Sequence, residues 1–546
     1  MSKTVIIGGV AGGASAAARL RRLKEDEEII TLEKGDYISY ANCGLPYHIG
    51  GTIENQDDLL LQTPEMMQKR FNIEVRIQNE VTKINPTKQE ITVYDSNKDE
   101  TYQETYDNLI IATGSSPLRP NIPGIDSPLI QTLWTVNDTT KIKTIIQQDH
   151  IQHVTIVGGG FIGLEMAENI KEAGKEVSLV EATNQVMAPL DFDMAQILHK
   201  HMQEHGVHLH LEDGVTSFEE DASQILVHLQ SGKQIKSDLV LLAIGVRPNS
   251  ALAKEAGLEM NARGGIIVDQ HMRTSIPNIY AVGDVVEVTE FISQDKSMIP
   301  LAGPANKQGR IAADNIAGIA SRYEGTQASS IVKVFDLTVA CTGLNEKSLV
   351  KKEIPYASIL FSQNSHATYY PGAKPMMIKL LFSKDGSKIY GGQIVGEEGV
   401  DKRIDTLGVA IRLGASIHDL KELELAYAPP YSSAKDPINM AGFVAGNLLE
   451  GHVSFAKWDE VETNQDAIIL DVREPQEVSN FGLENAINIP LGSLRQELAQ
   501  LDPNKEYIIF CAVGVRAYNA YRLLQQHGFK HLKVYPGGMR YYRLTH

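Results

Sequence analysis

Val154-Thr-Ile-Val-Gly158-Gly-Gly160-Phe-Ile-Gly163 is a short apolar strand that runs straight into a glycine-rich turn. A helix is expected from this turn through Ala173, and a second strand over residues 177–180 ends at Glu181. This is the order of a parallel βαβ unit, in which the turn brings a pyrophosphate to the bare N–H groups of the helix N-terminus. An acid that ends the second strand is placed to accept hydrogen bonds from ribose hydroxyls. The stretch therefore predicts a dinucleotide site.

A second unit of the same kind opens the chain. Thr4-Val-Ile-Ile-Gly8-Gly-Val10-Ala-Gly-Gly13 leads into a helix expected over residues 14–23, and a strand over residues 28–32 ends at Glu33. Val10 stands where the other unit has Gly160. One such motif is weak evidence. Two of them, about 150 residues apart and each followed by a strand-terminal glutamate, predict two dinucleotide sites.

Three further strands end in glycine. Leu109-Ile-Ile-Ala-Thr-Gly114 and Leu241-Leu-Ala-Ile-Gly245 are expected to lead the chain from one nucleotide domain to the other. The run from Thr274 to Gly283 ends at Asp284, whose carboxylate can accept a hydrogen bond from a ribityl hydroxyl of a flavin.

Length and composition limit the remaining choices. A chain of 546 residues is too long for a single core and indicates three to four domains. Its net charge of −17 argues against a nucleic-acid surface, which needs a basic face. Three cysteines cannot form a disulfide framework, and no apolar run is long enough to span a membrane. We therefore expect a cytoplasmic protein that binds neither nucleic acid nor membrane.

The residues after Trp458 form a separate small α/β unit. Its expected strands end at Asp471, Pro490, Cys511 and Gly538, and residues 446–458 are the expected linker. The loop Cys511-Ala-Val-Gly514-Val-Arg516 joins a strand to a helix over residues 517–526. Loop amides and the helix dipole pointing at the sulfur lower a thiol pKa and stabilise an attached anionic sulfur.

The paired motifs resemble the two-dinucleotide flavoprotein disulfide reductase family, and the C-terminal unit resembles a rhodanese domain. The resemblance implies an α/β fold with two nested Rossmann-like dinucleotide-binding domains, an α+β dimerisation domain and a rhodanese-like α/β domain. The implied boundaries are 1–117 for the first part of the FAD domain, 118–244 for the NAD(P)H domain, 245–325 for the second FAD part, 326–450 for dimerisation and 456–546 for the rhodanese domain.

The family also implies which residues touch the two cofactors, FAD and either NADH or NADPH. Glu181 favours NADH, because a carboxylate accepts from a free 2′-hydroxyl and repels a 2′-phosphate. The cofactor-binding residues implied by the resemblance are Gly8, Gly12, Gly13, Glu33, Ala112, Thr113, Gly114, Gly158, Gly160, Phe161, Ile162, Gly163, Glu165, Glu181, Gly245, Gly283, Asp284 and Ala302.

Cys43, in Ser39-Tyr-Ala-Asn42-Cys43, is a lone thiol at the position where related flavin reductases carry a CxxxxC pair. It can take an external sulfur as a mixed disulfide or cycle through a sulfenic acid. With the rhodanese unit, the chain resembles fused coenzyme A disulfide or persulfide reductases. That resemblance implies catalytic roles for Cys43, Cys511, Arg516 and, from the partner subunit of a homodimer, Tyr369 and Tyr427. It implies coenzyme A contacts at Ser15, Arg19, Arg22, Ser39, Asn42, Arg70, Asn306 and Lys435.

Two other functions stay open at this point. NADH oxidases and peroxidases of this fold use one cysteine as a sulfenic acid, but typically place a histidine where this chain has Ala11. A non-turnover redox sensor or sulfur carrier is the alternative of another class. The sequence fixes neither the preferred acceptor (coenzyme A disulfide, coenzyme A persulfide, glutathione persulfide or polysulfide) nor the direction of sulfur transfer between Cys511 and Cys43. No metal site is expected.

Overall fold

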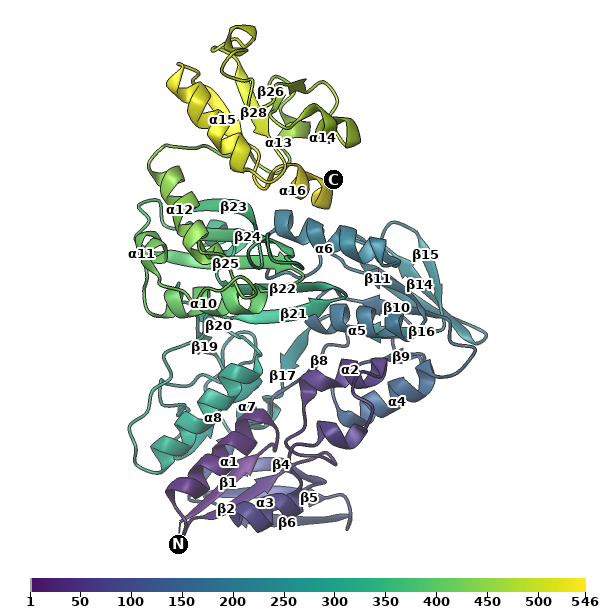
Figure 1. The fold of residues 1–546 in the computed structure, drawn as a ribbon. Coiled ribbons are helices and arrows are strands. Elements are labelled where there is room, and N and C mark those ends of the chain that lie inside the picture. Colours follow the sequence, from purple (N-terminus) through teal and green to yellow (C-terminus); the bar gives the residue numbers. More distant parts are fainter. Residues whose placement is uncertain (1) are drawn as a thin grey trace. The chain divides into compact units, whose positions relative to one another are not determined.

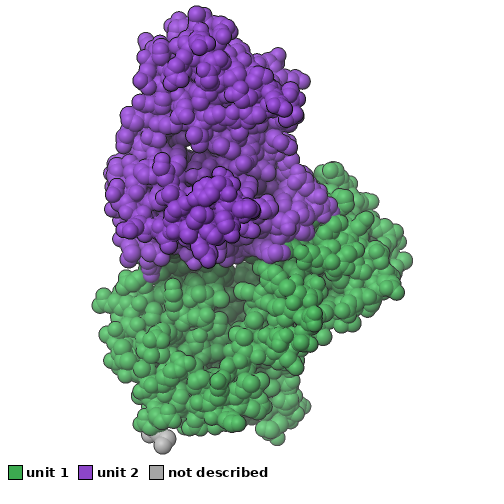
Figure 2. Space-filling view, in the orientation of Figure 1, with its two compact units in different colours: residues 1–184, 207–328 green, residues 185–206, 329–546 purple. Residues whose placement is uncertain are grey.

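The computed structural model describes residues 2–546, which divide into two compact units. One unit contains the chain up to residue 184 together with residues 207–328, and the other contains residues 185–206 and 329–546 (Figures 1 and 2). Residues 185–206 lie inside the expected NAD(P)H domain in sequence, but they pack with the second unit. In residues 2–546, no helix combines the length and the apolar character needed to cross a membrane.

The first unit contains a five-stranded parallel sheet built around the N-terminal strand. Its order is β18-β7-β1-β2-β3, and β1 lies at the centre because the chain runs outward from it in both directions. The helix after β1, α1 (Ala11–Leu23), packs against α8 (Ala302–Ile316) so closely that a Cβ at Gly309 would overlap the Gly12 carbonyl oxygen (Figure 1). The strands are β1 (Lys3–Ile7), β2 (Glu28–Leu32), β3 (Glu74–Arg76), β7 (Asn108–Ile111) and β18 (Ile279–Ala281).

A second parallel sheet repeats this plan inside the same unit. Its order is β12-β11-β10-β16-β9, and α5 (Phe161–Glu172) follows the central strand as α1 follows β1. Each parallel sheet is accompanied by a three-stranded antiparallel sheet, and β8 pairs with β17 where the chain crosses between the two halves. The strands are β9 (Ile130–Gln131), β10 (His153–Val157), β11 (Glu176–Val180), β12 (Val207–His210), β16 (Leu239–Leu242), β8 (Ser115–Pro117), β17 (Val246–Pro248), β4 (Asn79–Asn85), β5 (Glu90–Asp95), β6 (Glu100–Thr105), β13 (Val215–Asp221), β14 (Gln224–Leu229) and β15 (Gln234–Ser237).

The second unit contains a five-stranded antiparallel sheet of order β21-β22-β25-β24-β23. Lys379 on β24 is 2% exposed, and its ammonium pairs with Asp191, Asp193 and Glu346. Those two aspartates begin α6 (Phe192–Glu204), so this buried ion cluster helps to explain why residues 185–206 belong with this sheet. The strands are β21 (Ser330–Val334), β22 (Leu337–Gly343), β23 (Ala357–Asn364), β24 (Pro375–Phe382) and β25 (Ile389–Gly396), with helices α9 (Glu346–Lys351), α10 (Val400–Arg412), α11 (Ile417–Glu422) and α12 (Pro437–Leu449).

A four-stranded parallel sheet of order β27-β26-β28-β29 completes the second unit. Its central strands are apolar, and α15 (Val515–Gln526) packs on them through Ala517, Ala520 and Leu524. The elements are β26 (Ile468–Asp471), α14 (Pro475–Asn480), β27 (Ile487–Asn488), β28 (Glu506–Phe510), β29 (His531–Val534) and α16 (Gly538–Thr545).

The expected linker at residues 446–458 is much shorter in the structure. Helix α12 continues to Leu449 and includes Gly446. The helix passes so close to Lys421 that a Cβ at position 446 would overlap the Lys421 side chain, which explains why a glycine stands inside this helix. At the other end, the Val534 N–H donates to Ser454 (2.8 Å), and Val453 is part of the C-terminal core. Only residues 450–452 connect the helix to the C-terminal sheet.

Candidate functional site

The two glycine turns share the same backbone geometry. Gly8 and Gly158 both have positive φ, at 103° and 109°, a region that favours glycine. A Cβ at either would overlap a carbonyl oxygen of the neighbouring strand, at Ala112 and Ala243. Gly13 and Gly163 lie against the carbonyls of Gly8 and Gly158 in the same way. The residues that make these close contacts in the two turns are Gly8, Gly13, Gly158, Gly163, Ala112 and Ala243.

The middle position of the turns differs. A Cβ at Gly160 would meet no described atom within 4 Å, so the backbone is open there to a ligand. Val10 holds that position in the first turn and Gly160 in the second, and each is the N-cap of its helix. In residues 2–546, no side chain caps the N-terminus of α1 or α5. Both helices therefore present free N–H groups where a pyrophosphate would bind.

The two strand-terminal glutamates are held alike. The Gly9 and Gly35 N–H groups donate to Glu33 (both 2.9 Å). The Gly159 N–H donates to Glu181 at 2.8 Å, and the Thr183 N–H and hydroxyl each donate at 2.9 Å. Each carboxylate is thus fixed beside its glycine turn, as a partner for ribose hydroxyls should be.

Of the remaining predicted cofactor positions, Phe161, Ile162 and Glu165 lie on α5, and most of the others lie at the ends of β7, β16 and β18. Burial raises the pKa of Asp284, and the Ser115 hydroxyl donates to its carboxylate at 2.8 Å. Gly114, Gly245 and Gly283 all have positive φ where their strands end. Ala302 begins α8, whose N-terminus also has no side-chain cap among the described residues. The residues present fit FAD in the first sheet and NAD(P)H in the second.

Cys43 lies in a one-turn helix (Asn42–Gly44) followed by α2 (Leu45–Gly50). The segment before it is fixed by antiparallel pairing: Tyr40 bridges Leu60, and the Leu61 N–H donates to the Ser39 carbonyl (3.0 Å). Helix α2 lies so close to α5 that a Cβ at Gly50 would overlap Asn169. The thiol is thereby held near the helix that follows the second glycine turn.

The environment of Cys43 raises the pKa of its thiol. The side chain is exposed, yet the surrounding protein still displaces enough water to disfavour the thiolate, and the negative charge of Glu165 adds to this. Burial and the nearby Glu168 raise the pKa of Glu165 to about 7. The loss of water and the charge of Glu165 both favour the neutral thiol of Cys43 over its thiolate.

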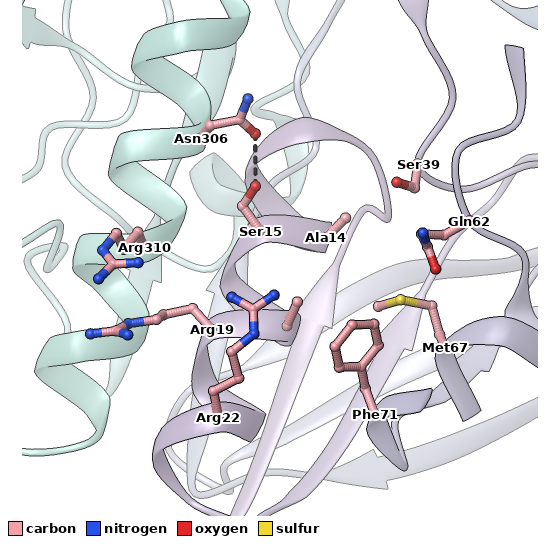
Figure 3. Close-up of a pocket in the computed structure, with 11 residues that line it drawn as sticks. Ala14, Ser15, Arg19, Arg22, Ser39, Gln62, Met67, Phe71, Asn306 and Arg310 are labelled. Atoms are coloured by element: carbon pink, nitrogen blue, oxygen red, sulfur yellow. Dashed lines mark hydrogen bonds between the residues drawn. The ribbon is translucent and has the colours of Figure 1, made fainter. Parts of the chain in front are cut away.

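A cavity of about 360 Å³ lies between α1, α8, the Ser39 segment and α3 (Pro64–Phe71) (Figure 3). Ser15 donates to Asn306 across it at 2.7 Å, and Ser39 lies on the opposite side (Figure 3). Five of the eight residues predicted to contact coenzyme A line this cavity: Ser15, Arg19, Arg22, Ser39 and Asn306.

Positive charge dominates this cavity. Arg19 pairs with Asp314 at 2.6 Å, whereas Arg22 and Arg310 have no carboxylate partner among residues 2–546. Arg22 instead lies over the ring of Phe71, 5.7 Å from its centre. The amide oxygen of Gln62 is buried and has no hydrogen-bond partner in the described chain. The cavity thus offers unpaired guanidinium groups to an anion and a free acceptor to a ligand N–H or O–H.

The other three predicted contacts lie elsewhere. Asn42, Arg70 and Lys435 do not line the cavity. Met67 and Phe71 are four residues apart, so they lie on the same face of α3, and this face lines the cavity. Arg70 lies on another face of the helix and is exposed to solvent. Sequence reasoning missed Arg310, although its spacing of four residues from Asn306 puts both on one face of α8. It also missed Gln62, Met67 and Phe71.

Tyr369 and Tyr427 lie together in the second unit. Their hydroxyls are hydrogen-bonded to one another, although 57 residues separate them in the chain. The hydrogen bond from Tyr427 raises the pKa of Tyr369. Tyr369 is 73% exposed and Tyr427 46% exposed, so both rings are available to another molecule.

Cys511 is 1% exposed at the end of β28. The Gly514 N–H donates to its sulfur at 3.1 Å, the one loop amide within hydrogen-bond distance in the described chain. Arg516 makes two bonds of 2.7 Å to Glu477, which hold the pKa of that carboxyl near 2. The N-cap of α15 is the same Gly514, and in residues 2–546 no side chain caps this helix, so its first N–H groups are free.

Two groups of possible metal ligands occur in the described chain. The Lys379 ammonium already occupies the group formed by Asp191, Asp193 and Glu346. The other group joins His201 and His205 to Asp336. Neither belongs to the sites described above, and the absence of a metal stays a prediction.

Known proteins match these features over the whole chain. Family models match at residues 2–309 (pyridine nucleotide-disulphide oxidoreductase), 329–437 (the dimerisation domain of that family) and 457–544 (rhodanese-like domain). The chain is 36% identical to the coenzyme A disulfide reductase of Staphylococcus epidermidis over 449 residues, which is 82% of this chain and 100% of that protein.

Two solved structures are similar along their full length. The reduced CoADR-RHD of Bacillus anthracis aligns with a TM-score of 0.96 and 49% identity, covering 100% of this chain and 98% of that one. A NAD-dependent persulfide reductase from A. fulgidus aligns with a TM-score of 0.95 and 35% identity, covering 99% and 100%. These findings confirm the predicted fold class and the predicted use of FAD and NAD(P)H. The chain belongs to the pyridine nucleotide-disulphide oxidoreductase family and carries a C-terminal rhodanese-like domain.

Proposed function

We propose that this protein uses NADH to reduce the S–S bond of coenzyme A persulfide or coenzyme A disulfide at Cys43. The observation that best supports this proposal is the cavity lined by Ser39, four residues before Cys43. Arg22 and Arg310 also line it, and neither has a carboxylate partner among the described residues. Guanidinium groups suit the phosphates of coenzyme A, and the apolar wall of Met67 and Phe71 suits its less polar parts. The S. epidermidis relative is named a coenzyme A disulfide reductase, and the A. fulgidus structure is that of a NAD-dependent persulfide reductase.

FAD held at Gly8, Gly13 and Glu33 of the first glycine turn would supply the two electrons that come from NADH. The Cys43 thiolate attacks the carbon-bound sulfur of coenzyme A persulfide, so that a Cys43–S–S–CoA bond forms and the S–S bond of the persulfide breaks. The departing sulfur leaves as hydrosulfide. Two electrons then cleave the mixed disulfide and return the Cys43 thiolate and the coenzyme A thiolate. The cavity residues hold the phosphates still during both steps.

We propose a homodimer in which Tyr369 and Tyr427 of one subunit reach Cys43 of the other. Their hydroxyls could donate to the departing sulfur. Several exposed apolar side chains on the same domain support an interface there, because contact with a second subunit would remove their apolar surface from water. They are Val409, Leu413, Tyr370, Tyr431 and Phe443.

The function is tested by steady-state NADH oxidation with coenzyme A persulfide, coenzyme A disulfide or oxygen as the acceptor. We expect rapid turnover with one or both coenzyme A acceptors and slow turnover with oxygen. Arg22→Gln should raise the KM for the coenzyme A acceptors by roughly 10- to 100-fold, because it removes one charge-assisted contact worth roughly 1.5–3 kcal/mol. Its rate with oxygen should not change.

Arg263→Gln is the matched control, since Arg263 is an exposed arginine of the same unit outside the cavity. It should leave every KM unchanged. Oxygen consumption as fast as turnover of either coenzyme A acceptor would instead indicate a NADH oxidase, and no NADH turnover with any acceptor would indicate a sensor or carrier.

Replacing Glu181 with alanine should shift the nucleotide preference toward NADPH. The carboxylate lies at the end of β11 and repels a 2′-phosphate, so its removal should raise the NADPH-to-NADH ratio of kcat/KM by about 10-fold or more. Glu33→Ala changes the equivalent carboxylate of the other sheet and should leave this ratio unchanged while weakening FAD retention. A Glu181→Ala ratio that stays constant or falls would contradict the assignment of the second sheet to NAD(P)H.

A further inference from the structure

A second cavity, of about 730 Å³, adjoins the loop that carries Cys511. Ala512 and Val513 of that loop form part of its wall, together with residues of α16. Lys200 and Glu204 on α6 also line it, although α6 lies outside the rhodanese-like domain in sequence. The cavity wall therefore includes residues from outside the rhodanese-like domain.

Three cations in this wall lack a carboxylate partner. In residues 2–546 no acidic group pairs with Lys200, Arg540 or Arg543. Lys200 donates to the Arg543 carbonyl, Arg540 donates to the Ser362 hydroxyl (3.2 Å), and Arg543 lies over the Phe481 ring. Burial lowers the pKa of Arg540, because it partly removes water from the charged guanidinium.

The other charges around the cavity cancel or are outnumbered. Arg473 pairs with Asp471 at 2.6 Å, and Glu477 pairs with Arg516. The His546 ring lies 3.4 Å from Glu462. Glu204 remains as one carboxylate against three unpaired cations. A ligand with more than one negative charge would complete this arrangement.

Helix α16 connects these cations to the sulfur loop. The Met539 N–H donates to the Cys511 carbonyl (2.8 Å) and the Arg540 N–H to the Ala512 carbonyl (3.0 Å). Arg540 and Arg543 are three residues apart and so share one face of the helix. The Tyr541 hydroxyl donates to the Asp193 carbonyl at 3.0 Å, which fixes α16 against α6. The positive side chains are thus held at a set place beside the loop.

We propose that this cavity binds a thiol or persulfide whose phosphate groups lie far from its sulfur, with Lys200, Arg540 and Arg543 on the phosphates and the sulfur end directed to Cys511. The inference rests on the proposed function, because it gives the rhodanese-like domain its own site for the phosphorylated thiol that the reductase uses. A volume of about 730 Å³ falls among the roughly 300–1,000 Å³ typical of cavities for organic ligands. A small inorganic donor such as thiosulfate needs neither this space nor three separate cations.

The chemistry at this site is a sulfur exchange without net oxidation. The Cys511 thiolate attacks the outer sulfur of the bound persulfide, forming a Cys511–S–S bond as the S–S bond of the donor breaks. The donor thiolate leaves, and its phosphates keep it in the cavity. The reverse reaction loads the same thiol from a Cys511 persulfide. Both directions conserve electrons and need no further reactant.

The test measures how fast each donor converts Cys511 to its persulfide in the full-length protein, followed by mass spectrometry of the C-terminal peptide without NADH. The donors are coenzyme A persulfide, pantetheine persulfide and thiosulfate. Pantetheine persulfide has the same sulfur arm but no phosphate. Arg540→Gln and Lys200→Gln should each lower the rate at limiting coenzyme A persulfide by about 10-fold, with less than a twofold effect on pantetheine persulfide or thiosulfate.

Arg540→Lys should recover part of the rate, and Arg495→Gln, an exposed charge removal in the same domain, should have no effect. Equal losses for coenzyme A persulfide and pantetheine persulfide, or no loss in either variant, would overturn the proposal. NADH-dependent reduction of preformed coenzyme A persulfide is measured in parallel and should survive in both variants. If the wild-type protein does not reduce coenzyme A persulfide with NADH, the proposed function at Cys43 is wrong. The rate of persulfide formation at Cys511 would still decide whether this cavity binds the donor.

Discussion

Replacing Cys43 with serine is expected to lower NADH-dependent reduction of coenzyme A persulfide by on the order of 10³-fold or more. A serine hydroxyl is not ionised at neutral pH and does not attack a disulfide sulfur, so the mixed disulfide cannot form. The FAD and NADH positions lie on the glycine turns of the two parallel sheets, and none of their hydrogen bonds involves Cys43. Flavin reduction by NADH should therefore proceed at the wild-type rate in an anaerobic stopped-flow experiment.

Cys341→Ala is the matched control. Cys341 is buried in β22 beside the Ser330 hydroxyl and belongs to the second unit, whereas both glycine turns belong to the first. Its replacement should leave reductase turnover unchanged and lower the stability of the fold slightly, since a buried side chain is shortened. Persulfide reduction that survives in Cys43→Ser above a few per cent of the wild-type rate would remove Cys43 from the reaction.

The sequence predicted the parts of this fold that depend on short-range patterns. A strand, a glycine turn and a helix follow each other within about 20 residues, and the φ values of Gly8 and Gly158 are those that such turns require. The strand-terminal positions of Glu33 and Glu181 followed from the same pattern. Each of these carboxylates accepts a hydrogen bond from the glycine turn of its own βαβ unit, at Gly9 and Gly159, so the two βαβ units are equivalent in this detail.

Features that depend on distant contacts were not predictable in this way. Arg310 enters the first cavity because α8 packs against α1, almost 300 residues earlier in the chain, and no local pattern encodes that contact. The linker was expected to begin at Gly446, but Gly446 lies within α12 and packs closely against Lys421. The grouping of residues 185–206 with the second unit depends on the buried Lys379 cluster, whose members are spread over nearly 190 residues.

The electrostatic state of the two reactive cysteines also depends on the folded structure. The sequence alone identifies Cys43 as a lone thiol where related flavin reductases carry a CxxxxC pair. Only the packing of α2 on α5 brings Glu165 near enough to raise the pKa of the thiol. For Cys511 the sequence predicts several amides around the sulfur, whereas in the described chain the Gly514 N–H is the one that donates to it.

Replacing Cys511 with serine is expected to abolish sulfur transfer from thiosulfate or a persulfide donor through the C-terminal domain, again by on the order of 10³-fold. Cys511 is the only cysteine of that domain, so no other thiol there can carry the sulfane sulfur. Serine has nearly the same size and can accept the Gly514 N–H, so the loop and the fold should be preserved. Thiocyanate formation from thiosulfate and cyanide measures the loss directly.

The same variant should reduce preformed coenzyme A persulfide with NADH at close to the wild-type rate. The two cysteines belong to different units of the chain, Cys43 to the unit of the glycine turns and Cys511 to the unit with the C-terminal sheet. Hydride transfer and attack on the S–S bond at Cys43 require no group from the Cys511 loop. If Cys511→Ser and Cys43→Ser abolish this reduction equally, Cys511 takes part in the reductive step itself, and its role as a sulfur carrier is wrong.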